Sequence, residues 1–270
     1  MSQRKSWTHA ELMLAMNLYC KLPFGQLDHR NPVIIEVSQR LGRTPSSLSM
    51  KLCNLASLDP QLQARGIKGL GSSSKGDREV WHEFNADWER FGVESEDHLQ
   101  LLLGKAMYEE LIVSPASEKT PKRRAFNLPT NTPIGPTEIV MTTKARLGQR
   151  FFRQSVLASY NCRCCVTGNP IAELLVASHI LPWGRYPEHR LNPRNGLCLA
   201  PTQDIAFDRG LITFDENYQL VVGSYLRDYL PNEALEQSFL VFEGKQIQLP
   251  DKFVPDSGFL QKHRAEVFLQ

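Results

Sequence analysis

A proline-rich, polar segment between residues 114 and 135 divides this chain and constrains its fold more than any other feature. The segment contains four prolines and the basic run Lys122-Arg123-Arg124. Prolines among small polar residues favour an extended linker over a packed element. A chain of 270 residues is long enough for two domains of roughly 100–200 residues each. We therefore expect a helical domain over 1–95, an acidic helix and basic linker over 96–135, and a second domain over 136–270.

The composition excludes several classes of protein. Hydrophobic residues make up 41% of the chain and charged residues 22%, which is typical of a globular protein. No apolar run approaches the roughly 20 residues that span a bilayer, and the first residues lack the apolar stretch of a signal peptide. Six cysteines are too few for a disulfide scaffold of this length. These features predict a cytoplasmic protein without a membrane segment.

The formal net charge of +2 hides an uneven distribution of charge along the chain. Residues 1–76 carry ten Lys and Arg against four Asp and Glu, whereas residues 77–114 carry three against ten. A basic first region is suited to bind a polyanion such as DNA. The alternative is a mildly basic, solvated surface.

Helix signals recur throughout the first half. Thr8 followed by Glu11 has the spacing of a capping box. Asn31-Pro32 and Thr44-Pro45 each place a capping residue before a proline that can start a helix, and Gly42 can end the helix between them. The pattern predicts three short helices, with a tight turn between the second and third. A later aromatic stripe at helical spacing predicts core packing: Trp81, Phe84, Trp88 and Phe91.

Two helices joined by a tight turn form the layout of a helix-turn-helix, in which the second helix lies in the major groove. Trp7 and the segment 41–52 resemble a Myb-like unit of this kind. The resemblance implies DNA contacts from the turn and the helix after it: Arg43, Ser46, Ser47 and Lys51. The alternative is a three-helix packing module in which these polar residues are solvated surface.

The second half contains a histidine inside the apolar stretch Leu174–Leu181, whose β-branched residues predict a strand. Taken alone, His179 in such a stretch is more often a core residue than a functional one. A loop rich in arginine and proline follows it. Asn195-Gly196 then predicts a hairpin-type turn before a short strand over 197–200, and a helix begins at Pro201.

This order of strand, loop, strand and helix carries three sequence blocks: Cys165–Gly168, Ser178–Ile180 and Asn195–Leu199. In that order they resemble the HNH endonuclease family, which has the ββα-metal fold. The expected fold class is therefore α+β: an all-α helix-turn-helix-like domain, a linker, and an HNH domain with extra strands. A hairpin predicted over 211–223 extends the HNH domain.

The resemblance implies hydrolysis of phosphodiester bonds in double-stranded DNA, assisted by Mg²⁺ or Mn²⁺. It also implies a role in restriction or anti-phage defence, where a protein of the defence system would be a second partner. In this interpretation His179 is the general base, because a neutral imidazole is available at cellular pH. Asn195 would fix the loop that orients His179.

The metal ligands implied by the resemblance depart from the family pattern. Asp204 is the expected ligand in place of the usual helix histidine, with Gln203 as the second choice. Ser178 stands where the family often has an acidic ligand. Asp208 is either a further carboxylate near the metal or an anchor of the helix through Arg209, and the second interpretation is favoured. The departures leave two alternatives open, which are a DNA-binding regulator with a degenerate site and a nuclease subunit that a partner activates.

Two further groups of residues need an interpretation. Cys162 and Cys165 have metal-ligand spacing, but the second domain has no second pair, so buried thiols are expected over structural zinc. Arginines at helical spacing before the site, and in the loop between its strands, are expected to bind DNA phosphates: Arg150, Arg153, Arg185 and Arg194. A solvated basic surface is the alternative.

Overall fold

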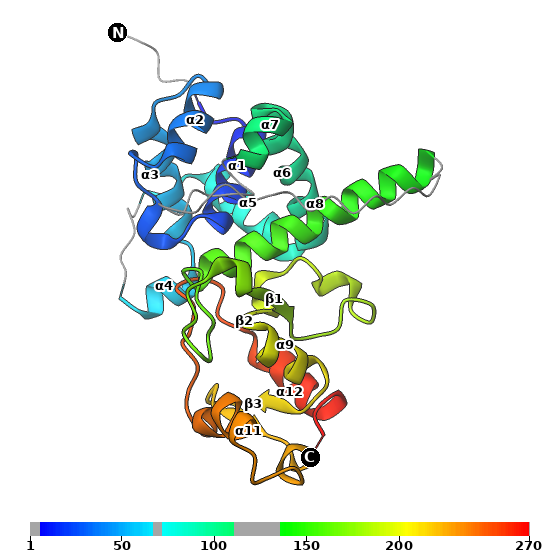
Figure 1. Ribbon diagram of the computed structural model, residues 1–270. Helices are drawn as coiled ribbons and strands as arrows, with labels where there is room; N and C mark the ends of the chain where they lie inside the picture. The colour runs from blue at the N-terminus through cyan, green and yellow to red at the C-terminus, as the bar shows by residue number, and fades with distance from the viewer. Residues whose placement is uncertain (1–5, 67–71, 111–135, 270) are drawn as a thin grey trace.

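The structure, a computed structural model, describes residues 6–66, 72–110 and 136–269. A group of helices from the first half lies at one end, and two small sheets with short helices lie at the other (Figure 1). The long helix α8 crosses between them. This arrangement confirms a mixed α and β chain with a helical first half. The predicted proline-rich segment over 114–135 lies outside the described residues.

Seven helices make up the described part of the first half. The capping box predicted at Thr8 is confirmed, because its side chain accepts the Glu11 amide and its own amide donates to the Glu11 carboxylate at 2.8 Å. Gly42 ends the second helix with a φ of +64°, a conformation that costs glycine little. The helices are α1 (His9–Lys21), α2 (Pro32–Arg40), α3 (Pro45–Ala56), α4 (Pro60–Ala64), α5 (Lys75–Ala86), α6 (Trp88–Leu103) and α7 (Lys105–Tyr108).

The aromatic stripe is divided between two helices, because Asp87 ends α5 and caps α6. Phe84 and Trp88 are buried on either side of this junction, with ring centroids 5.7 Å apart. The predicted core role of the stripe is therefore confirmed. Helix α6 runs through the boundary expected at residue 95, so this position does not separate two elements.

The second half begins with α8 (Pro136–Ser159) and continues with short elements. These are β1 (Val176–His179), β2 (Gly196–Leu199), α9 (Pro201–Asp208), β3 (Ile212–Phe214), β4 (Leu220–Val222), α10 (Ser224–Arg227), α11 (Glu233–Ser238) and α12 (Ser257–Glu266). Strands β1 and β2 form one antiparallel pair, and β3 and β4 form another, which confirms the predicted hairpin over 211–223. In the described part of the chain, no helix is both long and apolar enough to cross a membrane.

One prediction for the first pair of strands is wrong. Asn195-Gly196 is not a two-residue hairpin turn, since a loop over residues 180–195 joins β1 to β2. Gly196 instead pairs with His179 at the start of β2. A side chain at Gly196 would overlap Val156 of α8, so glycine is needed for close packing of the strand on the helix.

Helix α8 joins the two halves into one hydrophobic core. It packs against α1 and α6 on one side and against β1 and β2 on the other. Trp88 of α6 contacts both Phe151 of α8 and Phe253 near the C-terminus within this core, with ring centroids 6.4 and 5.5 Å apart, respectively. The helical half is thus packed directly against the half that contains the predicted site.

Lys252 adds a polar connection between the halves. Its side chain is fully buried and donates to the carbonyl oxygens of Tyr19, Cys20 and Leu22, the last at 2.7 Å. These carbonyls lie at the C-terminal end of α1, where the helix dipole favours a cation. Burial nevertheless lowers the pKa of Lys252 to about 8.

Candidate active site

The expected strand–loop–strand–helix unit is present, with β1 and β2 side by side and α9 packed against both. His179 is the last residue of β1, and the loop after it folds back over the histidine ring. Asp204 and Asp208 lie one turn apart on α9. The unit therefore places the end of one strand opposite one face of a short helix.

His179 is held between aromatic rings. Its imidazole stacks on Phe152 of α8, with centroids 3.8 Å apart and planes within 10°. Trp183 meets the ring edge-on at 5.3 Å. The Nε2 atom lies 2.9 Å from the carbonyl oxygen of Arg190. Because a carbonyl oxygen only accepts, Nε2 donates and Nδ1 is the ring atom that can take up a proton.

This environment also changes the acidity of the ring. Burial lowers the pKa of His179 below its usual 6.5, and the hydrogen bond to the Arg190 carbonyl offsets part of the decrease. The nearby Arg190 guanidinium lowers the pKa further. A lowered pKa keeps the imidazole neutral at cellular pH, which a general base requires.

Asn195 ties the loop to the strands. It is fully buried, and its Oδ1 atom accepts the Leu181 amide at 2.8 Å. Its Nδ2 atom donates to the carbonyls of Leu181 and His189, the latter at 3.0 Å. The backbone carbonyl of Asn195 accepts the Ile180 amide at 2.9 Å. Asn195 thus ties the residues that directly follow His179 to His189, which directly precedes the carbonyl that His179 contacts.

A cavity of about 390 Å³ lies beside the histidine. His179, Ser178, Asp204 and Asp208 all line it. The Ser178 hydroxyl is buried and makes no hydrogen bond at normal distance among the described residues. It lies close enough to Asp204 to lower the pKa of that carboxyl.

The two carboxyl groups of the cavity influence each other. Burial raises the pKa of Asp204 above its usual value, against the opposing effect of Ser178. Burial also raises the pKa of Asp208, and repulsion from Asp204 raises it further. Two partly buried carboxylates that repel each other favour the binding of a cation between or beside them.

Gln203 does not share this cavity. Its side chain is buried, and Nε2 donates to the Ser238 carbonyl at 3.0 Å, at the end of α11. The prediction that Gln203 is a metal ligand is therefore not supported, because its position on α9 turns it toward the neighbouring element. Asp208, for which a role in anchoring the helix was favoured over a place near the metal, lines the cavity. The spacing of Asp204 and Asp208 by four residues was the available signal, since such residues share a helix face.

His263 also lines the cavity, and sequence reasoning did not assign it a role. Its ring stacks on Phe207 at 3.8 Å and contacts the Phe207 carbonyl and the Thr213 hydroxyl. Burial lowers the pKa of His263 to about 4. The ring is therefore neutral and fixed by both nitrogen atoms, which suits a structural part of the cavity wall.

Two of the expected DNA contacts of the first half lie inside the structure. The Arg43 guanidinium makes an ion pair with Glu11 at 2.7 Å and lies 3.9 Å from the centre of the Trp7 ring. Lys51 is paired with the buried Asp77 at 2.8 Å. Both cations are largely buried, so they stabilise the helical packing and do not face a nucleic acid. Ser46 is exposed and Ser47 is half-buried on α3.

The expected phosphate-binding arginines of the second half are distributed over the surface. Arg150 is paired with Glu109 at 2.7 Å, and Arg185 is paired with Glu266 at 2.9 Å. Arg153 is exposed and donates to the Leu175 carbonyl at 2.9 Å. Arg194 is half-buried. The structure does not gather these four arginines into one cluster with the histidine cavity.

The cysteines of the second half provide no metal site in the described structure. Cys164 and Cys165 are buried, and the Cys164 sulfur accepts the Ala200 amide at 3.2 Å. Across residues 6–66, 72–110 and 136–269, no group of three or more His, Cys, Asp or Glu side chains is close enough to hold a metal ion. This result also limits the carboxylate site to two acidic side chains.

Comparison with protein families finds a match for the part of the chain that contains His179, Asn195 and Asp204. Residues 164–215 match a family described as HNH endonuclease. The matched region runs from the buried cysteines through β1, the loop, β2, α9 and β3. The resemblance drawn from the sequence blocks is thereby confirmed for this part of the chain.

The family match does not cover the first half of the chain. No curated protein matches the chain. The Myb-like resemblance of the first half and a role in restriction or defence therefore stay predictions.

Proposed function

We propose that this chain is a metal-dependent DNA endonuclease whose general base is His179. One observation carries the proposal: a neutral, oriented histidine and two carboxylates line a single cavity within the region that matches HNH endonucleases. The carbonyl of Arg190 occupies Nε2, so Nδ1 is left to accept the proton of an attacking water. Asn195 keeps that carbonyl in place through the loop.

The oxygen atoms of the cavity fit Mg²⁺ or Mn²⁺. Asp204, Asp208 and the Ser178 hydroxyl provide hard oxygen donors, and Mg²⁺ is commonly held by one or two carboxylates together with water and substrate phosphate. We propose Asp204 and Asp208 as the residues that hold the ion. A bound divalent cation supplies charge stabilisation for a phosphodiester undergoing hydrolysis.

Double-stranded DNA is the proposed substrate. Arg153 and Arg185 have exposed side chains in the second half, and they are the proposed phosphate contacts together with Arg194. Ser46 and Ser47 stay proposed contacts of the first half. Restriction or anti-phage defence is proposed from the family resemblance alone.

A second candidate function is a DNA-binding or partner-activated subunit with a degenerate site. The side chain of Gln203, at the position next to Asp204, points away from the cavity. The described residues also offer only a two-carboxylate site. These observations favour weak metal binding, which a partner protein could strengthen.

Plasmid cleavage tests the proposal. Supercoiled DNA incubated with the full chain and Mg²⁺ or Mn²⁺ should convert to nicked or linear DNA, and EDTA should prevent this. His179→Ala should abolish cleavage, whereas His29→Ala, which changes an exposed histidine, should retain it. Full activity in EDTA or in His179→Ala would contradict the proposal. Salt-dependent DNA binding without cleavage would favour the second candidate.

A further inference from the structure

Leu191, which follows Arg190 in the site loop, is inserted between two helices of the core. Its side chain is 1% exposed. A Cβ atom at Gly148 of α8 would lie 3.1 Å from both Leu191 methyl groups, and one at Gly92 of α6 would lie 3.2 Å from one of them. The absence of side chains at Gly92 and Gly148 thus creates the space that Leu191 fills.

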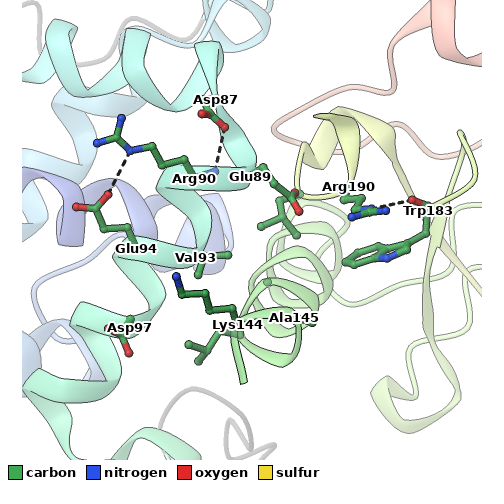
Figure 2. Close-up of a pocket in the computed structure, with 13 residues that line it drawn as sticks. Asp87, Glu89, Arg90, Val93, Glu94, Asp97, Lys144, Ala145, Trp183 and Arg190 are labelled. Atoms are coloured by element: carbon green, nitrogen blue, oxygen red, sulfur yellow. Dashed lines mark hydrogen bonds and ion pairs between the residues drawn. The ribbon is translucent and has the colours of Figure 1, made fainter. Parts of the chain in front are cut away.

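Glu89 lies one turn before Gly92 on α6 and reaches the same loop. Its carboxylate lines one cavity with Arg190 and Leu191. Burial raises the pKa of Glu89, and the Arg190 guanidinium and the Leu191 amide lower it by less. Its Oε2 atom is buried and has no hydrogen-bond partner among the described residues. Figure 2 shows Glu89 from α6 and Arg190 from the loop beside one cavity of about 900 Å³, which Trp183 also lines.

The contacts continue from this loop to the histidine. Arg190 donates from Nε to the Trp183 carbonyl at 2.7 Å, and its guanidinium lies 5.1 Å from the centre of the Trp183 ring. Trp183 meets the His179 ring edge-on, and the Arg190 carbonyl accepts from His179 Nε2. Any shift of Leu191 moves the adjoining Arg190 carbonyl, because the two share a peptide unit.

We propose that Leu191 and Glu89 are positioning residues for His179, through which helix α6 of the first half holds the general base in place. The inference rests on the proposed nuclease function and adds to it a role for the helical half. Leu191 fixes where the loop lies, and Glu89 fixes the loop backbone and the Arg190 side chain. Neither residue touches the reacting atoms.

This role predicts a loss of rate out of proportion to any loss of structure. A misplacement of about 1 Å in an oriented group can cost roughly 100-fold in rate, and loss of an orienting partner typically costs about 10- to 100-fold. We expect Leu191→Ala to lower kcat by about 10- to 100-fold and Glu89→Gln to lower it by about tenfold, with KM for DNA unchanged. Leu191→Met keeps most of the volume and should restore the rate.

Nuclear magnetic resonance on protein labelled with ¹⁵N-histidine provides a readout that does not depend on cleavage. In the wild type, the Nε2 proton of His179 should be visible and protected from exchange, because it is bound to the Arg190 carbonyl. His179→Ala assigns the signal. Leu191→Ala and Glu89→Gln should broaden or remove it, whereas Leu191→Met should retain it. Glu79→Gln, the same change at an exposed position of α5 outside both cavities, should also retain it.

The outcomes separate the two proposals. If the wild type cuts no DNA but the proton signal behaves as described, the positioning role stands and the nuclease proposal fails. If Leu191→Ala and Glu89→Gln are folded, as judged by circular dichroism, and keep both the rate and the signal, the positioning role is wrong. Should Leu191→Ala fail to fold, Glu89→Gln and Leu191→Met decide the matter by the same two measurements.

Discussion

The Nε2 atom of His179 donates to the carbonyl oxygen of Arg190 over 2.9 Å. This bond fixes which face of the imidazole is available and leaves Nδ1 as the basic atom. Phe152 and Trp183 bury the ring on two sides. Burial of the ring lowers its pKa, and the hydrogen bond to the Arg190 carbonyl offsets only part of this decrease.

The first prediction concerns the pH dependence of cleavage. Burial lowers the pKa of His179 below 6.5, so the base loses its proton at a lower pH than an exposed histidine does. The cleavage rate should rise with pH through a midpoint below 6.5 and then level off. Trp183→Ala should expose the ring and move the midpoint to higher pH. Single-turnover rates between about pH 4 and pH 8 measure this rise in the cleavage rate. A wild-type midpoint above pH 6.5 would contradict the assignment of His179 as the general base.

The second prediction concerns how Asp204 and Asp208 affect thermal stability in the absence and in the presence of a divalent cation. Like charges four residues apart on a helix cost about 0.2–0.5 kcal/mol, so Asp208→Asn should raise the unfolding temperature in EDTA by about 1 °C. Added Mg²⁺ or Mn²⁺ should stabilise the wild type, because a ligand that binds only the folded state raises its stability. Added Mg²⁺ or Mn²⁺ should stabilise Asp208→Asn much less than the wild type.

Differential scanning fluorimetry measures the unfolding temperature in EDTA and its increase when Mg²⁺ or Mn²⁺ is added. Asp228→Asn, a change in an exposed residue at the end of α10, serves as the control and should respond to cations like the wild type. An equal response of Asp208→Asn and the wild type would remove Asp208 from the proposed ion site.

The third prediction concerns stability in acid. The pKa of His263 is lowered to about 4 in the folded chain and returns to about 6.5 on unfolding. Between these values the unfolded state binds more protons, so the contribution of His263 is present above pH 6.5 and is lost as the pH falls to 4. The loss amounts to about 3 kcal/mol. Urea unfolding at several pH values measures it, and His263→Gln should flatten the dependence.

Local features of the fold were predictable from the sequence. The Thr8 capping box and the hairpin over 211–223 follow from residues near one another in the chain. The order of strand, loop, strand and helix around His179 was equally readable, because β-branched residues and an N1 proline act over a few residues. Asn195 is hydrogen-bonded to Leu181 and His189, and its role in orienting His179 stays a prediction.

The placement of other residues depends on longer-range packing. Asp208 lines the cavity and Gln203 does not, because the direction in which α9 packs decides which of its faces meets the cavity. Leu191 gave no signal at all, since the two glycines that receive it lie on α6 and α8 and are distant in sequence. A glycine within a helix predicts only a weaker helix until the neighbour that fills its space is known.

The last prediction separates structural cations from those that bind DNA. Arg43 makes two hydrogen bonds to Glu11, at 2.7 and 3.1 Å, and both side chains are largely buried. Removing one partner of a buried pair costs about 3–5 kcal/mol, so Arg43→Ala should lower the free energy of unfolding by several kcal/mol. Its DNA affinity, measured where the variant is folded, should keep the salt dependence of the wild type. Arg185→Ala, a change in an exposed residue that is a proposed phosphate contact, should do the reverse. It should leave stability nearly unchanged, because surface ion pairs contribute little, and reduce the slope of log affinity against log salt by about 1. A shallower slope for Arg43→Ala would return this residue to the DNA interface.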